Sequence, residues 1–171
     1  MAQKILVVGG DSAPPALVFE TFRDEMPVLG SLLARGAHGR LASTNPPITV
    51  PAWTAMMTSK DPGQLGCYGF RNRKDHSYDA YAFANASMVR EQRVWDLLGV
   101  AGKRSIVLGV PQTYPPRPIR GEVVGCFLTP STKASYTYPE SLKAEIERVA
   151  DGYVLDVEDF RTPDKVGLLA R

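Results

Sequence analysis

Strand-like and helix-like segments alternate along this chain, and their order constrains the fold more than any other feature. Residues 5–9 form a continuous aliphatic run that ends in glycines, which is typical of a parallel strand buried on both faces. We expect further strands at residues 38–43, 104–110, 122–128 and 153–157. Apolar residues at helical spacing predict helices at residues 17–33, with a break near Pro27, and at 94–101 and 141–150. This alternation predicts an α/β fold with a largely parallel sheet.

Length and composition indicate one globular domain. The 171 residues, without an internal repeat or linker, predict a single α/β domain over residues 1–171. The 20 basic and 18 acidic residues are too balanced for nucleic-acid binding by bulk charge. No apolar run is long enough to span a membrane, and the N-terminal run is too short for a signal peptide, so we expect a cytoplasmic protein. The two cysteines, Cys67 and Cys126, are expected to be buried thiols.

Asp11 is the first candidate functional residue. It follows the glycines that end the first predicted strand, and open parallel sheets bind ligands at that edge. A carboxylate there is well placed to bind a ligand. The alternative is a turn in which the Asp side chain bonds its own backbone, and the local sequence alone favours that turn.

Thr49 is the second candidate. Pro51 suits the first position of a helix over the following residues, which places Thr49 at the helix N-terminus. Unpaired backbone N–H groups and the helix dipole there lower the cost of an alkoxide and favour phosphate. The alternative, a threonine that only caps the helix, is favoured by the local sequence.

Asp11 and Thr49 together suggest one site. A threonine hydroxyl is a poor nucleophile at neutral pH and needs a base or a metal ion to activate it. A carboxylate at a neighbouring strand end can help to hold that metal. We therefore regard Asp11 as a candidate metal ligand and Thr49 as the candidate nucleophile.

The residues around both candidates resemble a known family. Residues 7–13, with the sequence VVGGDSA, resemble the opening strand of the alkaline phosphatase superfamily. Residues 48–54 (ITVPAWT) and 61–66 (DPGQLG) resemble its nucleophile helix, most closely in the type I phosphodiesterase/nucleotide pyrophosphatase branch. The resemblance covers most of the chain up to about residue 130. It implies an alkaline-phosphatase-like, three-layer αβα fold.

The same resemblance implies a reaction. In that family a Thr or Ser attacks phosphorus between two divalent metal ions, commonly zinc. Thr49 would accordingly be the nucleophile and a metal ligand, and Asp11 a metal ligand. The substrate would be a phosphodiester or pyrophosphate, a small phosphate ester such as a nucleotide.

The histidine content bears on whether the site is complete. The family's remaining metal ligands are Asp and His residues in the second half of a longer chain. This chain has two histidines, His38 and His76, and neither follows a later strand with a companion Asp. Because a catalytic zinc ion normally has three protein ligands, we expect an N-terminal part of a longer catalytic domain, inactive alone, with further ligands beyond Arg171.

A polar stretch of irregular structure is expected from residue 61 to about residue 86. Asn72 lies near the spacing at which nucleotide-cleaving relatives hold a phosphate oxygen, and Arg71 and Arg73 could clamp a phosphate. A solvated basic loop is the alternative. Two other functions stay open for the whole chain: a non-catalytic α/β module that binds an anionic ligand, and a phosphomutase on the same fold.

Overall fold

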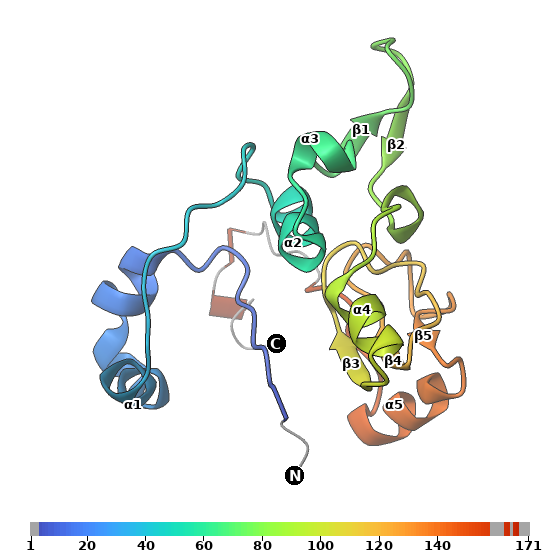
Figure 1. Cartoon of the computed structure of the whole chain (residues 1–171). Coiled ribbons are helices and arrows are strands. Elements are labelled where there is room, and N and C mark those ends of the chain that lie inside the picture. The colour runs from blue at the N-terminus through green and yellow to red at the C-terminus, as the bar shows by residue number, and fades with distance from the viewer. Residues whose placement is uncertain (1–3, 158–162, 165, 168–171) are drawn as a thin grey trace. The chain divides into compact units, whose positions relative to one another are not determined.

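The computed structural model describes residues 4–157, 163, 164, 166 and 167. The chain divides into two compact units, Met1–Ser43 and Thr44–Arg171, which are described separately (Figure 1). The sequence at 163–171 also predicts the opening of a helix, and most of that segment lies outside the described residues. None of the described helices is long and apolar enough to cross a membrane.

The first unit is helical. It contains a π-helical segment Ala16–Thr21, a 3-10 segment Arg23–Glu25 and helix α1, Pro27–Arg35. Pro27 starts α1, and Gly36 ends it by donating its N–H to the Leu32 carbonyl at 2.7 Å. The predicted break near Pro27 is therefore confirmed.

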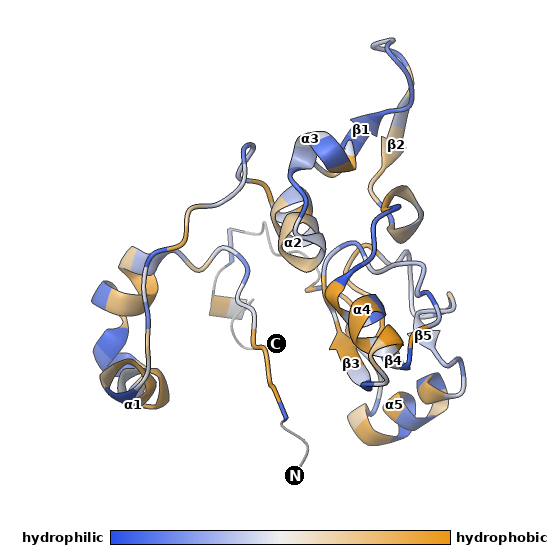
Figure 2. Ribbon diagram, in the orientation of Figure 1, coloured by the Kyte–Doolittle hydropathy of each residue, from blue (hydrophilic) through white to orange (hydrophobic). Residues whose placement is uncertain are grey.

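Two strands predicted in this unit, at residues 5–9 and 38–43, are wrong in this structure, because neither range has regular secondary structure. Residues 5–8 are an apolar run (Figure 2), yet Val8 is 85% exposed. A parallel strand needs neighbours for its hydrogen bonds and cover for both faces. The described residues show no strand paired with this run, so it remains extended.

The second unit contains several α-helices. They are α2 (Thr49–Thr58), α3 (Pro62–Leu65), α4 (Val94–Val100) and α5 (Leu142–Ala150), with a 3-10 turn at Ala86–Met88. Asp61 caps α3 by accepting the Gln64 N–H at 2.9 Å, and Gln64 Oε1 accepts the Asp61 N–H in return. Helices α4 and α5 lie where the apolar spacing predicts them.

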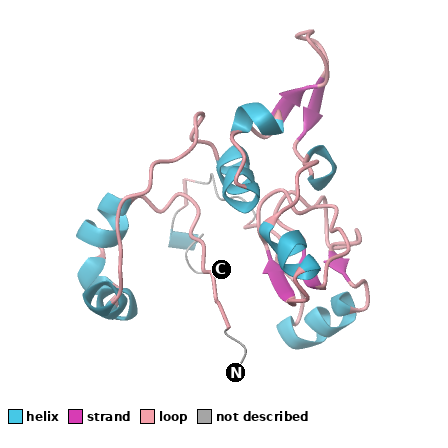
Figure 3. Ribbon diagram, in the orientation of Figure 1, coloured by secondary structure: helices cyan, strands magenta, loops and turns pink. Residues whose placement is uncertain are grey.

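The strands form two small sheets (Figure 3). Strands β1 (Arg71–Arg73) and β2 (Tyr81–Phe83) form an antiparallel hairpin within the stretch predicted to be irregular. Strand β3 (Ser105–Leu108) is parallel to β4 (Gly121–Val124), and β4 is antiparallel to β5 (Thr137–Tyr138). The predicted strands at 104–110 and 122–128 are confirmed in shorter form.

The α/β class is confirmed, but a largely parallel, three-layer sheet is not formed by the described residues. Only β3 and β4 are parallel among the pairs described, and residues 153–157 form no strand. Ile106 and Leu108 on β3 are 68% and 64% exposed, whereas a three-layer fold covers both faces of its sheet. The strand pattern is therefore α/β, with helix cover on one face of β3.

Buried side chains in the second unit form two apolar clusters. The first joins Val50 of α2 to Cys67 and Ala84. The second packs Trp95 of α4 against Val107 of β3 and Val123 of β4 (one face of the sheet). Cys67 and Cys126 are free thiols and buried, as predicted.

Tyr136 gives this unit a measurable pH dependence. Tyr136 is buried, and its hydroxyl donates a hydrogen bond to Glu147 Oε1 at 2.9 Å. Burial, aided by this acidic partner, raises the pKa of Tyr136 from 10.0 to about 12. Because the raised pKa favours the neutral form in the folded state, its stabilising effect is complete below about pH 10 and is lost as pH rises towards 12. Urea unfolding between pH 9 and 12 should show this loss in the wild type and a flatter profile in Tyr136→Phe. Parallel losses in both proteins would contradict the assignment.

Candidate functional site

Thr49 is the first residue of α2. The preceding Ile48 is extended, with φ −116° and ψ 145°, and Thr49 itself is half-buried. The first intrahelical N–H donor is Ala52, which bonds the Ile48 carbonyl at 3.0 Å, and Pro51, which has no N–H, lies among the preceding positions that donate no intrahelical hydrogen bond. Pro51 is thus the third residue of α2 rather than the first, but the predicted place of Thr49 at the helix start is confirmed.

The buried face of α2 carries hydroxyl groups. Val50, Thr54 and Thr58 recur every four residues and are all buried. The Thr58 hydroxyl donates to the Thr54 carbonyl at 2.7 Å, within its own helix. The Thr54 hydroxyl lies 2.8 Å from the Val50 carbonyl and also contacts Gln112 Oε1, so α2 is joined to another segment through Thr54.

Gln112 is the partner that sequence reasoning missed. Its side chain is 1% exposed, and its backbone has a left-handed φ of 64°. Nε2 donates to the Asn85 carbonyl at 3.1 Å, and Oε1 accepts from Thr54 and lies 3.7 Å from Cys67 Sγ. Gln112 has no local sequence signal, because its partners are distant along the chain.

Asn72 points into the protein from β1. Its side chain is 5% exposed, Oδ1 accepts the Tyr68 N–H at 2.8 Å, and Nδ2 donates to the Gly69 carbonyl at 2.9 Å. Nδ2 also lies 3.9 Å from Cys67 Sγ. A direct contact of Asn72 with phosphate therefore requires this loop to open. Its proposed substrate role stays a prediction.

Cys67 completes a chain of contacts between α2 and β1. Burial raises the pKa of the Cys67 thiol, against the opposing effect of its hydrogen bonds, so the sulfur stays protonated and can donate. We call Thr54, Gln112, Cys67 and Asn72 the buried polar network. It joins the helix that starts at Thr49 to the strand that holds Asn72.

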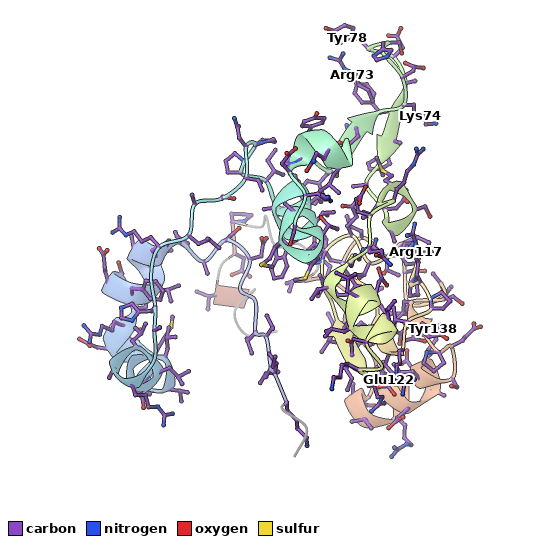
Figure 4. All side chains as sticks on the ribbon, viewed as in Figure 1. Arg73, Lys74, Tyr78, Arg117, Glu122 and Tyr138 are labelled. Carbon is purple, nitrogen blue, oxygen red and sulfur yellow. The ribbon has the colours of Figure 1, made fainter. Side chains whose placement is uncertain are left out.

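The arginines of the hairpin lie outside this network. Arg71 and Arg73 are exposed, and their guanidinium carbons lie 5.4 Å and 3.8 Å from the rings of Phe83 and Tyr78. Figure 4 places Arg73, Lys74 and Tyr78 at the far end of the hairpin. Their exposure leaves the predicted phosphate clamp and the solvated basic loop as alternatives.

Asp11 belongs to the first unit, where it is exposed and lies in a turn with Ser12. Thr49 belongs to the second unit. Each unit is described by itself, so the pairing of Asp11 with Thr49 in one site stays a prediction.

A metal centre requires several ligands close together. Among the described residues, there is no group of three or more His, Cys, Asp or Glu side chains that could hold a metal ion. Three protein ligands are the usual minimum for catalytic zinc. The described residues therefore do not provide a complete metal site.

Comparison with known proteins gives one match. A family model described as type I phosphodiesterase/nucleotide pyrophosphatase matches residues 5–168. No curated protein and no solved structure matches the chain. The match covers both segments that carry the predicted motifs, around Asp11 and around Thr49.

Proposed function

The chain belongs to the type I phosphodiesterase/nucleotide pyrophosphatase family, and we propose that it serves the hydrolysis of phosphodiester or pyrophosphate bonds with Thr49 as nucleophile. Members of this family are hydrolases. The observation that carries the proposal is the family match over residues 5–168, which includes the start of α2. The position of Thr49 as the first residue of that helix supports its role.

The proposed chemistry is a two-step phosphoryl transfer. Thr49 Oγ1 attacks phosphorus, the bond from phosphorus to the leaving oxygen breaks, and the proton of the threonine hydroxyl is passed to the leaving group through a base. Water then attacks the phosphorylated threonine, which restores the hydroxyl and releases the phosphate product. Backbone N–H groups and the dipole at the start of α2 favour the negative charge on the attacking oxygen.

The proposed substrate is a small phosphate ester such as a nucleotide. Arg71 is exposed on β1 and carries the donors needed to bind phosphate oxygens. Asn72 follows it on the same strand and acts in this proposal only if the loop at Tyr68 opens. The deciding measurement is hydrolysis of a chromogenic phosphodiester by a Thr49→Ala variant, because loss of a covalent nucleophile should lower kcat by several orders of magnitude.

Metal ions belong to the finer part of the proposal. The family is typically metal-dependent, and bound divalent metal ions stabilise the charge that develops in phosphoryl transfer. We propose two divalent ions, zinc being the expected metal, with Asp11 and Thr49 among their ligands. The ligand set is not complete within the described residues, as stated above.

Asp11→Asn should lower the metal content of the full-length gene product without unfolding it. The amide loses the charge that binds a divalent cation, while Asn keeps the size of Asp at this exposed position. Metal content measured by atomic emission should fall by about one ion per chain, with an unchanged midpoint of thermal unfolding for the metal-free proteins. Asp24→Asn, at another exposed acid of the same unit, should retain the wild-type content. Full metal content in Asp11→Asn would make Asp11 a turn residue only.

A further inference from the structure

We propose that Gln112 is a positioning residue that holds α2, and with it Thr49, against the segment carrying Asn72. The inference rests on the proposed role of Thr49 as nucleophile. It concerns residues that neither the resemblance nor the family match assigns, and it depends on contacts within the second unit alone.

The carboxamide of Gln112 joins three separate segments. It contacts Thr54 on α2, Cys67 before β1 and the Asn85 carbonyl after β2. The carbonyl of Asn85 can only accept a hydrogen bond, so Nε2 faces it. Oε1 therefore faces the hydroxyl and the thiol, both of which can donate. All of these contacts fit one orientation of one side chain.

The contact with Thr54 acts on the start of α2. The Thr54 hydroxyl lies between Gln112 Oε1 and the carbonyl of Val50, the residue next to Thr49. The first turn of a helix has few backbone bonds of its own, and here Ala52 is the first donor. Side-chain anchoring at Thr54 and burial of Val50 thus fix where the helix begins.

The surroundings make these bonds hard to replace. The network's Cys67 is also part of an apolar cluster with Val50 and Ala84. The exposed fractions of Val50, Cys67 and Ala84 are 0%, 1% and 3%. Water does not compete effectively for a donor in such a place, and an unmatched polar atom there is costly. A hydrogen-bonded amide buried in this cluster accordingly restricts α2 to one position.

The backbone of Gln112 provides a second, independent observation. Its φ of 64° lies in the left-handed region, where glycine or asparagine is the less strained choice. A long side chain in this conformation persists when its contacts offset the strain. Here those contacts are the bonds to Thr54 and Asn85. With this backbone conformation, the side-chain amide of Gln112 contacts Thr54 on α2.

The test compares two buried threonines of the same helix. Thr54→Val removes the hydroxyl that bonds Gln112, whereas Thr58→Val removes a hydroxyl whose bonds remain local. In the full-length gene product, Thr54→Val should lower kcat for a chromogenic phosphodiester roughly ten- to hundredfold with KM changed less than about twofold, because misplacing a nucleophile affects turnover more than binding. Thr58→Val should keep kcat within about twofold. Thr54→Ser, which restores the hydroxyl, should regain most of the loss.

A double-mutant cycle and hydrogen exchange complete the test. Gln112→Leu combined with Thr54→Val should be no worse in kcat than the more damaging single change, because both break the contact between Thr54 and Gln112. Deuterium uptake by a peptide covering residues 49–58 should rise in Gln112→Leu and in Thr54→Val but not in Thr58→Val. Hydrogen exchange reports on the local stability of α2 even if the Gln112→Leu variant has little activity.

Two results would overturn the inference: equal kcat in Thr54→Val and Thr58→Val, or independent losses in the double variant with unchanged exchange in α2. If Thr49→Ala still abolishes turnover in that case, the proposed function stands and only the role of Gln112 is wrong. If Thr49→Ala retains activity, the proposed nucleophile is wrong. The inference then fails with it, even where the exchange result shows that Gln112 anchors the helix.

Discussion

Thr49→Ala should lower kcat for phosphodiester hydrolysis by about a thousandfold or more in the full-length gene product. The variant has no hydroxyl to form the phosphorylated intermediate, and the helix N–H groups cannot supply a nucleophile. The fold should survive, because α2 is also held by buried Val50 and by the contact of Thr54 with Gln112. Steady-state kinetics and a circular dichroism melt of the same preparation separate these two effects.

Two further variants make the Thr49 result specific. Thr49→Ser keeps a hydroxyl and should retain measurable turnover. Thr44→Ala removes a different threonine, whose hydroxyl donates to the Pro46 carbonyl at 2.8 Å in the loop before α2, and should stay within about threefold of wild type. Activity of Thr49→Ala within the same threefold range would remove Thr49 from the mechanism.

Local signals were sufficient to predict the two helices α4 and α5. The apolar spacing at 94–101 ends at Gly102, and α4 occupies Val94–Val100. The helix predicted at 141–150 is α5, Leu142–Ala150. Helical periodicity and glycine stops depend on neighbours in sequence, so such elements can be predicted from short windows.

The pairing of strands could not be predicted from short stretches of sequence. The aliphatic run at residues 5–9 has the composition of a buried strand, but composition does not supply a partner. In the hairpin, by contrast, strands formed where none were predicted. Arg-Asn-Arg is a poor strand sequence, yet β1 pairs with β2 across the loop between Arg73 and Tyr81. Pairing depends on residues distant in sequence, and neither result could be inferred from composition alone.

The residues of the candidate site also differ in whether local sequence signals could place them. Thr49 could be placed at a helix start because Pro51 and the apolar residues after it are local signals. The role of Gln112 could not be predicted in this way, because its contact with Thr54 joins two segments that are far apart in the sequence. The proposed metal ligand Asp11 lies in the separate first unit and stays a prediction.

Gly121→Ala should cause the largest loss of stability among the substitutions considered. Gly121 opens β4 opposite Ser105 with φ 141°, and a Cβ there would lie 1.8 Å from the Ser105 carbonyl oxygen. That atom belongs to the backbone of β3 and cannot rotate away as a side chain can. Strain and overlap together should cost about 4 kcal/mol, which is a large share of the roughly 5–15 kcal/mol that stabilises a domain.

The loss should appear as separation of β3 from β4, because Val107 and Val123 bury Trp95 only while that pair is intact. Urea unfolding of the full-length gene product, followed by tryptophan fluorescence, should show the lower midpoint. Gly102→Ala is the matched control: its φ is 73°, but a Cβ there meets nothing within 4 Å, so only backbone strain of about 1–2 kcal/mol applies. The difference between the two variants therefore measures the close approach of β4 to Ser105. Equal losses would mean that β3 and β4 are not paired in this register.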